Sequence, residues 1–96
     1  MKTLVILAVL SSMLCAQQGK KLFEAKCAVC HSADSNEHRV GPGLKGAKDG
    51  TLPGGKSATP EVILKQLNSG GGGMPVFKEL LTNDEKKQLI AYVLSL

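Results

Sequence analysis

The chain has 96 residues, with 12 Lys and Arg against 8 Asp and Glu and a formal net charge of +4 at pH 7. This length indicates a single domain, and the basic residues form only short pairs at 20–21 and 86–87, which excludes a continuous basic tract of the type that binds nucleic acid. With no Trp, two Phe and one Tyr, the apolar core is thin, and domains of this size usually need a further stabilising element.

Residues 1–16 have the pattern of a secretory signal peptide. Lys2 gives a positive start, residues 4–10 form a short apolar core, and Ala16 is a small residue at the expected cleavage point. The apolar run is too short for a membrane-spanning helix, so we expect cleavage after Ala16, export to the periplasm and no stable membrane insertion. An alternative is lipid attachment at Cys15, although the residue before it is larger than is typical for that modification.

The first helix of the remaining domain, residues 17–96, is expected from about Gln18 to Cys27. It ends in the run Cys-Ala-Val-Cys-His at 27–31, which in an exported chain is typical of covalent attachment of a c-type haem. Two thiols at i and i+3 lie about one helical turn apart, so both can form thioethers with the vinyl groups of one porphyrin. The histidine that follows is then carried to the iron, which an imidazole nitrogen can coordinate.

Three other interpretations of residues 27–31 are less consistent with the sequence. Structural zinc usually takes four ligands, often from two Cys-x-x-Cys pairs, and no second pair exists. A thioredoxin-like redox pair requires a strand–helix context, which the sequence does not offer after its first residues. The third interpretation is a local disulfide. Loss of Cys15 with the signal leaves only Cys27 and Cys30, so this would be the one intramolecular disulfide possible. A buried haem would also supply the apolar volume that the thin core lacks.

A long irregular segment rich in Gly and Pro is predicted at 32–58, followed by a second helix. Loops of this length usually have a function of their own, and wrapping around a haem is one. Thr59 is expected to cap the second helix, with Pro60 at its first position and Gly70 at its end. The predicted apolar face of this helix is Ile63, Leu64 and Leu67.

The third helix is predicted to start at a capping box formed by Thr82 and Glu85 and to reach the end of the chain. Apolar residues recur on one side of it with a helical period. These residues are Leu89, Tyr92, Val93 and Leu96. Three helices without strands predict an all-α fold.

Met74 is the only methionine of residues 17–96 and follows four glycines at 70–73. A thioether suits haem iron and raises its reduction potential, and glycines permit a close backbone approach, so Met74 is the expected second iron ligand. In one alternative Met74 fills the core and the iron is five-coordinate; in another His38 is the ligand, which its short tether to His31 disfavours. Four glycines exceed what a ligand turn needs, and flexible padding is the simplest interpretation.

Taken in order, these motifs resemble the small bacterial monohaem cytochromes c of class I. The resemblance rests on residues 19–31, on Gly-Pro-Gly-Leu at 41–44, on Met-Pro-Val-Phe at 74–77 and on residues 81–92. It implies the cytochrome c fold, with three main helices and long loops wrapped around one covalently bound haem. It further implies that Gly19 and Phe23 pack against Leu89 and Tyr92 of the C-terminal helix.

The resemblance assigns roles within the site. His31 and Met74 would be the axial iron ligands, the Pro42 carbonyl would accept a hydrogen bond from the second ring nitrogen of His31, and Leu44 would pack on the haem. Relatives often place a Trp near a haem propionate, and this chain has none, so the groups that hold its propionates are open. The predicted site residues are Cys27, Cys30, His31, Pro42, Leu44 and Met74.

The expected function is that of an exported one-electron carrier between larger redox proteins. With both axial positions filled, no site is open to a substrate, so we expect a carrier and not an enzyme, and a monomer without nucleic-acid partners. Since Lys2 leaves with the signal, the net charge falls from +4 to +3. The resemblance further implies that Lys26, Lys45 and Lys78 surround the thioether-bonded haem edge, where the electron would leave, and meet acidic docking surfaces there. The alternatives are a haem enzyme or sensor with five-coordinate iron or a labile Met74, and a thiol–disulfide protein.

Overall fold

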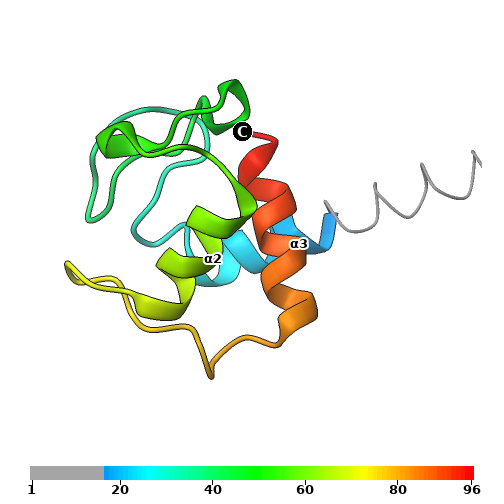
Figure 1. Ribbon diagram of the computed structural model, residues 1–96. Helices are drawn as coiled ribbons and strands as arrows, with labels where there is room; N and C mark the ends of the chain where they lie inside the picture. Colours follow the sequence, from blue (N-terminus) through cyan, green and yellow to red (C-terminus); the bar gives the residue numbers. More distant parts are fainter. Residues whose placement is uncertain (1–16) are drawn as a thin grey trace, which may run out of the picture.

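The computed structural model describes residues 17–96, so the expected signal peptide lies outside the described residues. Residues 17–26 are helical. The further elements are η1 (Ala47–Asp49), η2 (Pro53–Gly55), α2 (Pro60–Ser69) and α3 (Asn83–Leu94) (Figure 1). Between 17 and 96 the only β-type pairing consists of isolated bridges, and the predicted all-α class is confirmed. None of the helices in this part of the chain is long and apolar enough to cross a membrane.

The ends of α2 agree with the predicted capping pattern. The Val62 N–H donates to the Thr59 hydroxyl at 3.3 Å, Pro60 occupies the first turn, and the Gly70 N–H donates to the Gln66 carbonyl at 2.8 Å. The predicted apolar face needs one correction, because Leu64 is 38% exposed. The buried face of α2 consists of Ile63 and Leu67.

Helix α3 begins with the predicted capping box. The Glu85 N–H donates to the Thr82 hydroxyl at 3.1 Å, and the Thr82 N–H donates to the Glu85 carboxylate at 2.9 Å. Its buried face is displaced from the predicted one, since Tyr92 is only partly buried. The buried residues are Lys86, Leu89, Ile90 and Val93.

The N-terminal helical residues pack across α3, as the resemblance implied. The rings of Phe23 and Tyr92 have centroids 5.3 Å apart and are inclined by 56°. A side-chain carbon at Gly19 would overlap the Gln88 carbonyl, so only glycine allows this approach. Phe23 and Leu89, 2% and 1% exposed, form the centre of the core. This crossing places the end of the first helix, and with it residues 27–31, beside α3.

The irregular segment 32–58 is held by backbone hydrogen bonds instead of regular structure. The Gly41 N–H donates to the Cys30 carbonyl and the Leu44 N–H to the Ser32 carbonyl, both at 2.8 Å. The Gly46 N–H reaches the Leu96 carbonyl at 2.6 Å, so this segment lies against the C-terminal end of α3 (Figure 1).

Candidate haem site

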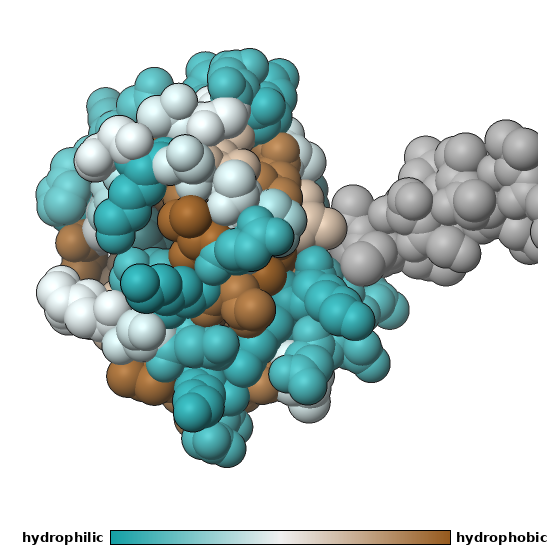
Figure 2. All heavy atoms as spheres, viewed as in Figure 1, coloured by the Kyte–Doolittle hydropathy of each residue, from teal (hydrophilic) through white to brown (hydrophobic). Residues whose placement is uncertain are grey.

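A cavity of about 350 Å³ opens between the end of the first helix, the irregular segment, α2 and the loop after α2. Its volume lies within the roughly 300–1,000 Å³ that is usual for small-molecule sites. Figure 2 shows apolar side chains gathered at the centre of this face, with hydrophilic side chains around them. The apolar lining includes Phe23, Leu44, Leu52, Ile63, Leu67 and Val93.

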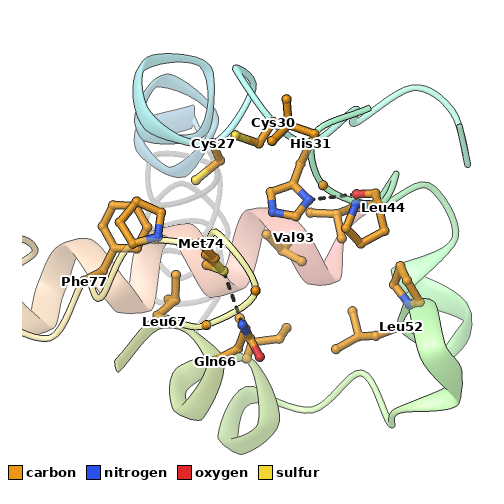
Figure 3. A pocket seen from close by; sticks show the side chains of 18 of the residues that line it. Cys27, Cys30, His31, Leu44, Leu52, Gln66, Leu67, Met74, Phe77 and Val93 are labelled. Carbon is orange, nitrogen blue, oxygen red and sulfur yellow. Dashed lines mark hydrogen bonds between the residues drawn. The ribbon is translucent and has the colours of Figure 1, made fainter. Parts of the chain in front are cut away.

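Both cysteines of the motif line this cavity as free thiols (Figure 3). The Cys30 and His31 N–H groups both donate to the Cys27 carbonyl, at 3.1 and 2.8 Å, so the three residues form one helical turn. Burial, with a smaller contribution from neighbouring Cys30, raises the pKa of the Cys27 thiol to about 11, against a lowering effect of Lys26. Cys27 is therefore uncharged at neutral pH and compatible with an apolar wall.

The imidazole of His31 is held in one orientation. Its Nδ1 lies 2.7 Å from the Pro42 carbonyl oxygen. Since a carbonyl can only accept, Nδ1 is the donor in this bond, and Nε2 is the ring nitrogen left for coordination. A side-chain carbon at Gly41 would lie 2.6 Å from Cε1 of the ring, so the Gly41 backbone forms a close support behind it.

Met74 lies at the end of a tight hairpin. Gly71 and Met74 exchange two backbone hydrogen bonds of 3.0 Å, and the intervening Gly72 and Gly73 have φ of 62° and 93°. Positive φ at both central positions is characteristic of a type I′ turn, which glycine adopts without strain. Gly71, Gly72 and Gly73 therefore form a specific turn with Met74, and Gly70 ends α2, so each of the four glycines has a defined place in the backbone.

Gln66 is a site residue that the sequence analysis missed. Its Nε2 lies 3.4 Å from the Met74 sulfur and 3.2 Å from the Gly70 carbonyl oxygen (Figure 3). One amide therefore connects the end of α2 to the hairpin and to the thioether, and the sulfur retains a second lone pair. The only sequence signal for this role is a polar residue in the last turn of α2, which is too common to identify it.

The remaining predicted residues lie in different places. Pro42 and Leu44 line the cavity with the motif, and exposed His38 also borders it. Of the three lysines expected to share a docking edge, Lys26 lines the main cavity and Lys45 a second hollow of about 290 Å³. Lys78 is exposed and lines neither hollow, so these three side chains do not border one opening.

The residues of this cavity fit a haem. Two thiols, an imidazole nitrogen and a thioether sulfur face one predominantly apolar space, and the absence of a side chain at Gly41 leaves room for the imidazole ring. Such a donor set suits covalently attached haem iron. Across residues 17–96, no group of three or more His, Cys, Asp or Glu side chains is arranged to hold a metal ion, so these side chains assemble no zinc site of that kind.

Comparisons with known proteins agree with this chemistry. Residues 15–93 match the family model described as cytochrome c oxidase, cbb3-type, subunit III. The chain is 35% identical over 79 residues to cytochrome c6 of Leptolyngbya boryana, covering 82% of this chain and 89% of the relative. It is 37% identical over 79 residues to cytochrome c6 of Tetradesmus obliquus, covering 78% and 83%.

A solved structure has the same architecture. Cytochrome c6 from the diatom Phaeodactylum tricornutum superimposes with a TM-score of 0.63 at 34% sequence identity. The match covers 83% of this chain and 91% of the diatom protein, so the similarity extends over most of both folds.

Proposed function

The chain belongs to the small monohaem class I c-type cytochromes, which carry one covalently bound haem c, and on this premise we propose that it is an exported one-electron carrier. One observation carries the proposal: the Cys27 and Cys30 thiols, the His31 imidazole and the Met74 thioether all line the same cavity. A haem attached to the two cysteines would have one candidate ligand from the motif and another from a distant loop.

Each residue has a defined task in this proposal. Cys27 and Cys30 would hold the haem as thioethers, and His31 and Met74 would supply the two iron ligands. When bound, haem c supplies an iron that accepts and releases one electron. The Pro42 carbonyl keeps the Nδ1 proton of His31, which leaves Nε2 free and increases its basicity. Leu44 and the other apolar lining residues exclude water.

With a protein ligand on each side, no axial position is left for a substrate, so we propose a carrier and not an enzyme. The competing function is a haem enzyme or sensor in which Met74 is displaced or absent from the iron. One hydrogen bond favours a Met74 that stays on the iron. The Phe77 N–H donates to the Leu67 carbonyl at 2.7 Å, which fixes the chain just after Met74 to α2.

The proposal includes location and partners. Residues 1–16 act as a signal that is cleaved after Ala16 and directs the protein to the periplasm. There it serves a respiratory chain as a monomer, exchanging electrons with larger redox proteins. The basic excess favours acidic docking surfaces, which mainly raises the rate of encounter.

An absorption spectrum of the purified protein, with a potentiometric titration and an intact mass, tests the proposal. We expect the mass of a chain that begins at Gln17 and carries one covalent haem. We also expect a reduction potential typical of a thioether-ligated iron, and slow or absent binding of carbon monoxide. Rapid carbon monoxide binding by the native ferrous protein would favour the enzyme or sensor. A low potential of the bis-histidine type would contradict ligation by Met74, and a chain without covalent haem would contradict the whole proposal.

A further inference from the structure

The main cavity has two chemically different ends. Cys27 and Cys30 lie at one end, and Leu52 lies across the cavity from Cys27 (Figure 3). Lys56 belongs to the Leu52 end, since the Leu52 N–H donates to the Lys56 carbonyl at 2.7 Å and both residues line the cavity. A bridge between residues 51 and 57 closes this segment into a small loop. The end opposite the cysteines is therefore a defined wall that contains a cation.

A second hollow, of about 290 Å³, adjoins the same wall. It shares Pro42, Leu52 and Pro53 with the main cavity and is lined by Lys45. Lys56 and Lys45 thus border two adjoining hollows that have these three residues in common. No Asp or Glu of the described chain lines either hollow, so no acidic side chain of the lining competes for the two ammonium groups.

Porphyrin chemistry gives the two ends different tasks. The vinyl groups that form thioethers are on two neighbouring pyrrole rings, and the propionates are on the other two. A haem attached through Cys27 and Cys30 therefore directs its two carboxylates away from the attachment end. Carboxylates at the border of an apolar cavity are costly unless they are paired or hydrogen-bonded. Lys26 also lines the cavity, but it directly precedes Cys27 at the wrong end.

We propose that Lys56 and Lys45 pair with the two haem propionates, one lysine from each hollow. The inference rests on the proposed function, because it requires a haem attached through Cys27 and Cys30. It assigns the propionate partners in a chain that has no Trp for this purpose. A lysine beside a propionate offsets negative charge near the iron, so removal of the lysine charge stabilises the ferric state and lowers the reduction potential.

The test uses the haem-loaded full chain with K56Q, K45Q and the double variant K45Q/K56Q. Lys48 supplies the matched control K48Q, because it is an exposed lysine of η1 that lines neither hollow. K56R and K45R keep the charge. The readouts are the midpoint potential in low salt and in 1 M salt, where the Debye length is about 3 Å, and the carboxylate bands in oxidised-minus-reduced infrared spectra.

We expect each Gln variant to lower the potential, the double variant to lower it by about the sum, and the Arg variants and K48Q to retain the wild-type value. Because Lys45 and Lys56 are exposed, the shift should be smaller in 1 M salt than in low salt, yet exceed that of K48Q in both. A moved carboxylate band should accompany it. Shifts no larger than that of K48Q, or a shift confined to K26Q or H38Q at the other basic residues that line the main cavity, would overturn the assignment. If the variants carry covalent haem but show no shift, the propionate assignment is wrong and the proposed function is unaffected. If the wild-type protein carries no covalent haem, both the assignment and the proposed function are wrong.

Discussion

The two sides of the cavity hold their proposed iron ligands by different means. The His31 ring donates to the Pro42 carbonyl at 2.7 Å and has the Gly41 backbone directly behind it. The Met74 side chain lies at the end of a glycine hairpin, and the one hydrogen bond to its sulfur comes from Gln66. The first ligand is positioned mainly within one short stretch of sequence, whereas the second depends on contacts between α2, its following loop and α3.

The chain that follows Met74 is hydrogen-bonded to both α2 and α3, which restrains it although it follows a run of glycines. The Phe77 N–H donates to the Leu67 carbonyl at 2.7 Å, and the buried Lys86 ammonium donates to the Lys78 carbonyl at 2.9 Å. These bonds connect the chain after Met74 to α2 and α3, respectively. We therefore expect substitutions in α2 or α3 to weaken the binding of Met74 to the iron, whereas only substitutions next to His31 should disturb that ligand.

The largest effect is expected from Met74→Leu, which removes the proposed ligand and keeps the apolar volume. The potential should fall by a sizeable fraction of the roughly 0.8 V range that axial ligands span, and the ferrous protein should bind carbon monoxide rapidly. Titration and carbon monoxide mixing measure both. An unchanged potential would show that Met74 is not an iron ligand.

Gly41→Ala disturbs the His31 side, because the added carbon would lie 2.6 Å from the ring. We expect a loss of about 1–3 kcal/mol in the free energy of unfolding, as is usual for overpacking, measured by urea unfolding of the haem-loaded protein. Leu80→Ala is the control, since Leu80 is 63% exposed and lines neither hollow, and such substitutions usually change stability by less than about 0.5 kcal/mol. Equal stability of the two variants would contradict the close packing of the Gly41 backbone against the His31 ring.

Lys86→Met tests the attachment of the Met74 side to α3. Lys86 is 6% exposed, and Met keeps much of its length while removing the hydrogen bond to the Lys78 carbonyl. We expect a loss of about 1 kcal/mol, the usual net value of one hydrogen bond, and faster displacement of Met74 by added imidazole. The neighbouring exposed Lys87→Met is the control, and the prediction fails if both variants exchange the ligand at the wild-type rate.

The smallest effect is expected from Gln66→Leu, which removes the N–H donor 3.4 Å from the Met74 sulfur. The positive end of this N–H dipole favours the less positive, reduced iron, so its loss should lower the potential modestly while Met74 remains bound. Gln88→Leu is the control, because Gln88 donates to Gln18 away from the cavity. A raised potential, or loss of the Met74 ligand, would contradict this account.

Sequence patterns predicted much of the fold because they act over short distances. The capping residues Thr59 and Thr82 bond to groups three positions away, so the helix starts could be read directly. The same holds for the motif at 27–31, whose spacing depends on a single helical turn. The buried faces were less predictable: Leu64 is exposed and Lys86 is buried, because burial depends on which other segments cover a helix.

The sequence by itself determined the attachment motif, one candidate ligand beside it, the unique methionine of residues 17–96 and the family that these motifs resemble. Only the tertiary structure decided that Gln66 reaches Met74, that three glycines form a specific turn with Met74, and that Lys45 and Lys56 border adjoining hollows. The reason is physical. Bonds within one turn of helix are encoded locally, whereas the surroundings of a cavity are set by the packing of segments that are distant in the chain.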